Sequence, residues 1–139
     1  MSSKLSKNQL EKYSRQIILK NIGVLGQKKI LNSRVLVIGM GGLGCPVAEF
    51  LTRSGIGSIG IVDHDLVSLS NIHRQTLYDE KDIGKSKVHV AQKKLQNINS
   101  KTKINIFNFK LDKKNFIKII KNYDYVVDGT DNFETKFLI

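Results

Sequence analysis

Two kinds of hydrophobic pattern alternate along this chain. Val35–Ile38 is apolar at every position, which is typical of a strand that is buried on both faces of a parallel sheet. Lys85–Ile98 has apolar residues at helical spacing. The same reasoning predicts strands at Ser58–Val62, Lys103–Phe109 and Tyr123–Val127, and helices at Leu43–Ser54, Asn115–Asn122, from Phe133 onward, and over most of Asn8–Leu31 with breaks near Gly23 and Gly26.

The order of these elements predicts an α/β fold with a doubly wound, mainly parallel sheet, as in Rossmann-like domains. We expect residues 1–33 to form an N-terminal helical segment and residues 34–139 to form the nucleotide-binding domain. The chain stops within the last predicted helix, so we expect this domain to be truncated at its C-terminus. Leu66–Asp82 is predicted to be a polar, irregular connection, and connections of that length are often functional.

A cluster of glycines follows the first strand. Gly39, Gly41 and Gly44 have the spacing of the dinucleotide fingerprint, and Gly42 is an additional glycine within it. Glycines allow a tight turn and a close approach of the backbone to a ligand, and the unpaired amides at a helix N-terminus attract anions. The cluster therefore predicts a nucleotide phosphate site.

Two other predicted strands end in carboxylates, at Asp63–Asp65 and at Asp128–Asp131. Ligands of doubly wound sheets bind beyond the carboxyl ends of the strands, so these segments should converge with the glycine cluster. Asp63 would accept hydrogen bonds from ribose hydroxyls; the alternative is a turn or capping aspartate. Asp131 would bind Mg²⁺ beside phosphates; the alternative is a helix N-cap, a task that Asp131 and Asn132 could divide between them.

Basic and amide side chains follow the second strand. Arg74 could hold phosphate oxygens in bidentate fashion, and Asn71 could hydrogen-bond to phosphate or ribose; the alternative is a solvated loop. Lys87 opens the next helix, where its ammonium would add to the positive end of the helix dipole. Without further context, Arg15 is a surface arginine, and Cys45 is a packing residue.

The composition narrows the possible partners and locations. The net charge is +11, but the lysines are scattered along the chain, so we expect no nucleic-acid function, although an acidic protein partner could be attracted. No apolar run approaches the ~20 residues of a membrane span, and the polar N-terminus lacks a secretory signal. A single cysteine fits a reducing compartment, so we expect a cytoplasmic protein, or one of an organelle stroma if the gene is organellar.

Six motifs occur in an order that resembles one known family. They are Tyr13-Ser-Arg-Gln-Ile17, Gly39-Met-Gly-Gly-Leu-Gly-Cys-Pro46, Asp63-His-Asp65, Ser68-Leu-Ser-Asn-Ile-His-Arg-Gln75, Gly84-Lys-Ser-Lys87 and Asp128-Gly-Thr-Asp-Asn132. From about Tyr13 to its end, the chain resembles the N-terminal half of the ThiF/MoeB/HesA proteins, bacterial relatives of ubiquitin-activating enzymes.

The resemblance implies an adenylyltransferase. Such enzymes use Mg²⁺ and ATP to activate the C-terminal Gly-Gly carboxylate of a ubiquitin-like sulfur carrier of the MoaD or ThiS type, and they release pyrophosphate. The resemblance also implies a homodimer in which Arg15 reaches the partner's site. By position, the resemblance implies that the glycine turn with Gly42 lies at the phosphates and that Asp63 holds the ribose. It implies that Asn71 and Arg74, within the stretch Ser70–Arg74, hold ribose and phosphates. It also implies that Lys87 neutralises the phosphates and that Asp131 binds Mg²⁺, with Asn132 beside it.

Several alternatives stay open at this point. Molybdopterin, thiamine and tRNA-modifying members of the family share these motifs. Family members continue for about another 100 residues or more, which carry the zinc-binding cysteines; those ligands are absent from this chain. The glycine motif and Asp63 alone would also fit an NAD-dependent oxidoreductase, and a truncated chain could be an inactive nucleotide-binding module.

Overall fold

The computed structural model describes residues 4–137. Four strands form one sheet: β1 (Arg34–Ile38), β2 (Ser58–Val62), β3 (Lys103–Phe107) and β4 (Tyr125–Asp128). The helices are α1 (Lys7–Lys12), α2 (Ser14–Ile17), α3 (Gly23–Asn32), α4 (Gly44–Ser54), α5 (Lys87–Ile98), α6 (Lys113–Ile120) and α7 (Phe133–Lys136), with 3₁₀ turns η1 (Leu69–Asn71) and η2 (Glu80–Asp82).

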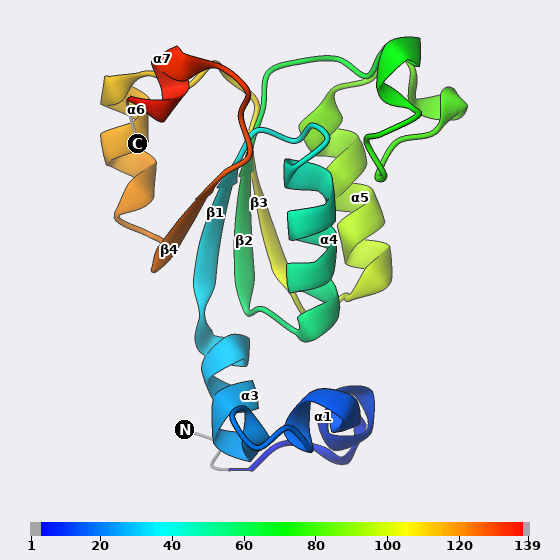
Figure 1. The fold of residues 1–139 in the computed structure, drawn as a ribbon, viewed down its shortest axis with the longest axis vertical. Coiled ribbons are helices and arrows are strands. Elements are labelled where there is room, and N and C mark those ends of the chain that lie inside the picture. Colours follow the sequence, from blue (N-terminus) through cyan, green and yellow to red (C-terminus); the bar gives the residue numbers. More distant parts are fainter. Residues whose placement is uncertain (1–3, 138–139) are drawn as a thin grey trace.

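The sheet is entirely parallel in its described part, with the strand order β3-β2-β1-β4. The chain first moves outward from β1 to β3 and then returns to the other side of β1 with β4. This reversal is the switch point at which doubly wound folds bind ligands, and it confirms the predicted fold class. Helices α4 and α5 cover one face of the sheet and α6 covers the other, while α1 and α3 lie beyond the amino ends of the strands (Figure 1).

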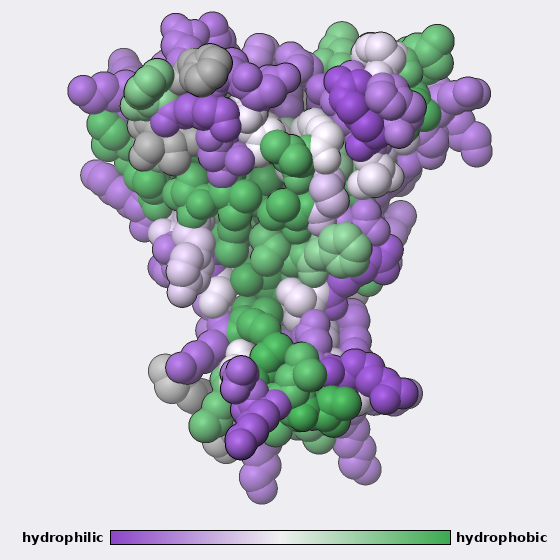
Figure 2. All heavy atoms as spheres, viewed as in Figure 1, coloured by the Kyte–Doolittle hydropathy of each residue, from purple (hydrophilic) through white to green (hydrophobic). Residues whose placement is uncertain are grey.

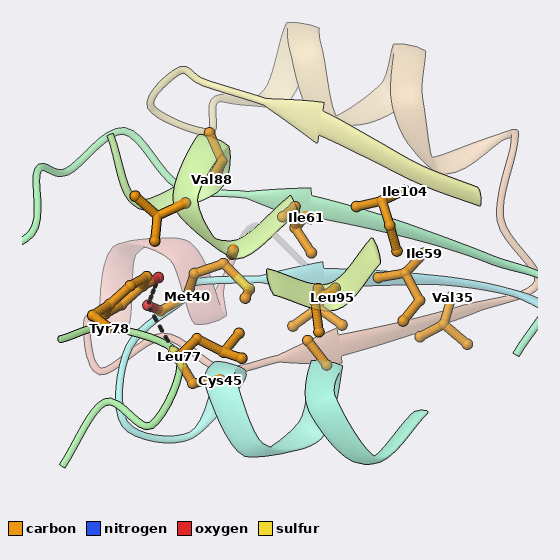
Figure 3. Packing of buried hydrophobic residues seen from close by; sticks show 14 of the residues in the cluster. Val35, Met40, Cys45, Ile59, Ile61, Leu77, Tyr78, Val88, Leu95 and Ile104 are labelled. Carbon is orange, nitrogen blue, oxygen red and sulfur yellow. Dashed lines mark hydrogen bonds between the residues drawn. The ribbon is translucent and has the colours of Figure 1, made fainter. Parts of the chain in front are cut away.

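Two hydrophobic clusters hold these layers together. Val35 and Val37 of β1 point into the larger cluster beneath α4 and α5, and Leu36 and Ile38 point into the smaller cluster beneath α6. All four side chains are at most 4% exposed, which explains why β1 is apolar at every position. Figure 3 shows the larger cluster, where residues of the sheet meet Leu95 and Val88 of α5.

Several predicted boundaries were wrong. Gly26 does not break a helix but lies inside α3, and a methyl group there would lie only 3.1 Å from the Ile22 side chain, so the close approach of Ile22 favours glycine despite its low helix propensity. The break falls before Gly23, which has a φ of +58°. β3 ends at Phe107, which pairs with Val62, the last residue of β2, and so the strand does not reach Phe109.

The connection between β2 and α5 is more ordered than its polarity suggested. It contains η1 and η2, and it buries Val67, Leu77 and Tyr78. Lys94 of α5 anchors its far end through ion pairs of 2.7 Å with Asp79 and 2.9 Å with Asp82. The prediction of an irregular connection was therefore wrong in part. The end of the helix predicted from Phe133 onward, at residues 138–139, lies outside the described residues.

One face of the molecule exposes apolar side chains beside β4. Figure 2 shows them between the two upper lobes and again over the N-terminal helices. Leu43 just before α4, Phe50 of α4 and Tyr125 of β4 are each at least 64% exposed, and Leu25 of α3 is 74% exposed. Within residues 4–137, no helix has the length and apolar character needed to cross a membrane.

Candidate functional site

A cavity of about 620 Å³ lies at the carboxyl ends of the strands. It brings together the three segments that the sequence placed there: the glycine turn after β1, Asp63–Asp65 after β2 and residues 129–132 after β4. The connection after β2 adds Asn71, Arg74 and Gln75, α5 adds Lys87, and the segment after β3 adds Phe109, Lys110 and Leu111. The predicted convergence at this edge of the sheet is confirmed.

The glycine turn requires glycine at its two ends. Gly39 has a φ of +86°, and a methyl group there would lie 3.1 Å from the backbone of Gly129. A methyl group on Gly44 would lie 1.7 Å from the carbonyl oxygen of Gly39. Between them, Gly41 and Gly42 line the cavity, and a methyl group on Gly42 would meet only the side chain of Arg74, at 3.7 Å or more. The outer glycines therefore shape the turn, and the inner glycines face the ligand space.

Asp63 joins the end of β2 to this turn. Its Oδ2 accepts a hydrogen bond of 2.8 Å from the amide of Met40, and its Oδ1 accepts one of 2.8 Å from the amide of Asp65. Asp63 is therefore a turn aspartate, as the alternative interpretation held. Since each carboxylate oxygen has a second lone pair, this role leaves room for the hydrogen bonds from ribose that we predicted.

The connection after β2 presents Arg74 to the cavity. Arg74 is exposed, and its Nη1 donates 2.7 Å to the carbonyl oxygen of Ser70. Asn71 is only 9% exposed, and its Oδ1 accepts from the amide of Ser68 at 2.9 Å. Asn71 and Arg74 both line the cavity, whereas the hydroxyl of Ser70 points to Ser68, at 3.0 Å. Asn71 thus shapes the connection as well as lining the cavity, and Ser70 contributes mainly its backbone.

Lys87 brings a buried cation to the cavity wall. It is the first residue of α5, its side chain is 6% exposed, and its Nζ lies 3.4 Å from Oδ2 of Asp65. The Asp65 carboxylate is 57% exposed, so solvent weakens its attraction for the Lys87 ammonium. An incoming anion would gain attraction from the Lys87 ammonium, which stands at the positive end of the α5 dipole.

Three polar residues at the end of β4 and after it have different roles. Asn132 caps α7, since its Oδ1 accepts 2.7 Å from the amide of Thr135. Burial raises the pKa of the Asp128 carboxyl, but hydrogen bonds from Thr130, at 2.6 and 2.9 Å, and the nearby Lys136 outweigh it, so this pKa is lowered. Asp131 is exposed, lines the cavity and has no hydrogen bond or ion pair to residues 4–137, so its carboxylate is available to a cation.

Arg15 does not join this cavity within one chain. It lies exposed on α2, among the N-terminal helices at the other end of the sheet (Figure 1). Cys45 is fully buried among apolar residues, and burial raises the pKa of its thiol. Its role as a packing residue, rather than a nucleophile, agrees with the prediction.

Sequence reasoning missed two residues that line the cavity, Gln75 and His64, and one that supports it from behind, Tyr78. Gln75 is 4% exposed and lines it next to Gly41, and its Oε1 has no hydrogen-bond partner in the described part of the chain. Tyr78 holds the glycine turn from behind through a hydrogen bond to Met40. His64 forms a possible metal-binding group with its two neighbouring aspartates, whose ligand atoms lie within 4.8 Å of one another. Of these three residues, Gln75 had a clear signal in the sequence, namely its position directly after Arg74.

A larger cavity, of about 720 Å³, lies at the opposite end of the sheet beneath α1 and α3. A buried hydrogen-bond network borders it: the side-chain amide nitrogen of Asn99 donates 3.1 Å to the Tyr13 hydroxyl and 3.0 Å to the carbonyl of Thr52, and its Oδ1 accepts from Lys12 at 2.9 Å. This network joins α1 and Tyr13 to α4 and to the C-terminal end of α5, and the cavity lies at the amino ends of the strands rather than at their carboxyl ends. We therefore assign the functional site to the cavity of about 620 Å³ at the carboxyl ends of the strands.

The fold and the site together define a Rossmann-like domain with a phosphate-binding type of glycine turn. The profile of the ThiF family matches residues 13–139, and the chain belongs to this family. The resemblance seen in the motifs is thereby confirmed.

Named relatives agree with this assignment. The chain is 42% identical to the sulfur carrier protein adenylyltransferase of Thermus thermophilus, over 96% of this chain and 49% of that protein. It is 46% identical to the adenylyltransferase and sulfurtransferase MOCS3 of Culex quinquefasciatus, over 99% of this chain and 31% of that protein. The crystal structure of E. coli MccB with ATP superposes with a TM-score of 0.78 at 28% identity, over 91% of this chain and 40% of MccB. The chain thus spans about a third to a half of the length of these proteins.

Proposed function

We propose that this chain is the ATP-binding part of an adenylyltransferase that activates the C-terminal carboxylate of a small sulfur-carrier protein. The observation that carries the proposal is the meeting of Arg74, Lys87 and Asp131 with the glycine turn around one cavity. Two cations and a carboxylate without a partner suit a triphosphate with its metal ion better than a nicotinamide. The names of the relatives from Thermus and Culex, and the ATP in the MccB structure, support the same reaction.

The reaction needs a better leaving group on a carboxylate, which is a poor electrophile. A carboxylate oxygen of the carrier attacks the α-phosphorus of ATP, the bond from that phosphorus to the bridging oxygen of pyrophosphate breaks, and an acyl-adenylate forms. Negative charge moves onto the departing pyrophosphate, so the site must position the two reactants and neutralise charge. It needs no side-chain nucleophile, which agrees with the buried, apolar surroundings of Cys45.

We assign the roles as follows from position and charge. Lys87 and Arg74 neutralise the phosphates, and Asp63 accepts hydrogen bonds from the ribose. Asn71 supports the connection that carries Arg74, and its amide borders the ligand space. The glycine turn lets the backbone approach the phosphates closely.

Asp131 fits a magnesium ligand. It is exposed at the cavity and forms no ion pair with the described residues. Asn132 caps α7, so the carboxylate of Asp131 is not needed for that role. Mg²⁺ in nucleotide sites is usually held by one or two carboxylates together with phosphate oxygens, and its charge lowers the barrier to phosphoryl chemistry. We place no zinc in this chain.

The carrier would be a ubiquitin-like protein of the MoaD or ThiS type that ends in Gly-Gly, and its pathway would be molybdopterin or thiamine synthesis. We also propose a homodimer in which Arg15 serves the partner's cavity, because in its own chain this residue lies at the far end of the sheet.

The test is carrier-dependent exchange of pyrophosphate into ATP, with Mg²⁺ and a panel of carriers ending in Gly-Gly. Asp131→Asn should abolish exchange, and Glu134→Gln is the matched control, because it removes one charge from the neighbouring helix at an 88% exposed side chain. Calorimetric titration of ATP with and without Mg²⁺ would accompany the exchange assay. Binding that does not depend on Mg²⁺, or a preference for NAD over ATP, would contradict the proposal.

A further inference from the structure

Side chains from two distant segments hold the peptide groups of Met40, the second residue of the glycine turn. The Met40 amide donates 2.8 Å to Oδ2 of Asp63, at the end of β2. The Met40 carbonyl accepts 2.7 Å from the hydroxyl of Tyr78, in the connection after β2, and a weaker contact of 3.4 Å from the thiol of Cys45 (Figure 3). The turn is therefore clamped at Met40 from both sides.

The hydroxyl of Tyr78 is the stronger donor to that carbonyl. Tyr78 is 4% exposed and Met40 is fully buried, so water does not readily replace the hydrogen bond. A tyrosine phenol is protonated at physiological pH, and burial raises the pKa of Tyr78 further, so the hydroxyl stays a donor. Without the Tyr78 hydroxyl, the buried Met40 carbonyl would keep only the thiol of Cys45, which is a weak donor. Most of the free-energy cost of removing that carbonyl from water would then be uncompensated.

Tyr78 also belongs to the segment that carries the cavity's polar groups. Its amide donates 3.1 Å to the carbonyl of Gln75, whose own amide donates 2.9 Å to the carbonyl of Asn71. Arg74 lies beside Gly42, with its Cγ 3.7 Å from the place of a Gly42 methyl group. The hydroxyl of Tyr78 thus links the segment with Asn71 and Arg74 directly to the turn that it faces.

We propose that Tyr78 is a positioning residue for nucleotide binding: its hydroxyl fixes the Met40 carbonyl, and it thereby sets the glycine turn and Arg74 at the distance that a phosphate chain requires. The part of this inference that concerns nucleotide rests on the proposed function. Tyr78 itself touches no ligand and acts through Met40.

The test compares Tyr78→Phe with Tyr13→Phe. The control also removes a hydroxyl from a buried network, since Tyr13 is 3% exposed and accepts from Asn99 at 3.1 Å, but it lies at the far end of the sheet. ATP affinity is titrated at a temperature where both variants are folded, and we expect about a tenfold rise in Kd for Tyr78→Phe and no change for Tyr13→Phe. Equal affinities of the two variants would overturn the proposal, even if both lose thermal stability.

Hydrogen exchange without nucleotide separates this proposal from the proposed function. The amides of Met40 and Cys45 donate 2.8 Å to Oδ2 of Asp63 and 3.0 Å to the carbonyl of Gly41, and both should exchange faster in Tyr78→Phe than in the wild-type chain or in Tyr13→Phe, whichever ligand the cavity takes. Unchanged exchange at these amides would overturn the role of Tyr78, whereas failure of the wild-type chain to bind ATP would count against the proposed function instead.

Discussion

Replacement of Gly44 by alanine sets two physical effects against each other. Gly44 begins α4, and helix propensity alone predicts that alanine stabilises a helical position by up to about 1 kcal/mol. The structure predicts the opposite sign. The new Cβ would lie 1.7 Å from the carbonyl oxygen of Gly39 and 2.8 Å from its carbonyl carbon, far inside the ~3.5 Å of an ordinary contact.

The backbone around Gly39 cannot move aside cheaply. Its amide donates 2.8 Å to the carbonyl of Val62, its φ is +86°, and the backbone of Gly129 lies against it. Forced overpacking commonly costs 1–3 kcal/mol, and a clash with backbone belongs at the upper end, so we expect Gly44→Ala to lose about 3 kcal/mol. For a chain of this length that corresponds to a fall in Tm of about 12 °C.

Urea and thermal unfolding would measure this loss, and Gly42→Ala is the control within the same motif. A methyl group on Gly42 meets only the flexible Arg74 side chain at ordinary contact distances, so we expect a change within about 0.5 kcal/mol. If Gly44→Ala were neutral or stabilising, or if both alanines cost the same, the argument from the turn's geometry would be refuted.

Three further predictions concern charge. Lys87→Met should weaken ATP binding by about ten- to a hundredfold in titration calorimetry, because a nearly buried ammonium is lost from the cavity; unchanged affinity would exclude it from the site. If Arg15 serves a partner's cavity, mixing inactive Arg15→Ala with inactive Lys87→Met should restore part of the pyrophosphate exchange, and no recovery in verified mixed dimers would contradict that role. Hydrogen bonding to Lys94 lowers the pKa of Asp79. Burial raises the pKa of Asp82, but Lys94, the amide of Asp79 and the charge of Lys85 together outweigh it and lower this pKa, so both carboxyls stabilise the fold above their unperturbed pKa of 3.8. This contribution is lost as the pH falls, and acid unfolding between about pH 5 and pH 3 should therefore be steeper in the wild type than in Lys94→Met; parallel curves would count against the pair.

The residues of the glycine turn illustrate how far sequence reasoning reached into the site. Gly39, Asp63 and Asp131 could be placed at one edge because each follows a run with strand character, and parallel strands end together. Cys45 could be judged a packing residue because no base stands near it in the sequence. By contrast, Arg74 and Lys87 were selected among many basic residues mainly through the resemblance to a family, since scattered lysines give no pattern of their own.

The sequence by itself determined the class of fold, the order of the strands in the chain and the position of the phosphate-binding type of turn. Those features follow from local rules: the period of apolar residues, the conformational freedom of glycine and the right-handed crossover between parallel strands. They require no knowledge of which distant residues touch.

Only the tertiary structure decided which side chains hold the site in shape. The hydrogen bond from Tyr78 to Met40 joins residues 38 positions apart, and the pairing of Lys94 with Asp79 depends on how a polar connection folds back onto α5. It also showed that Gly26 lies inside α3 with Ile22 close against it, and that Arg15 lies away from the cavity of its own chain. Such contacts arise from long-range packing, whose partners leave no periodic trace in the sequence.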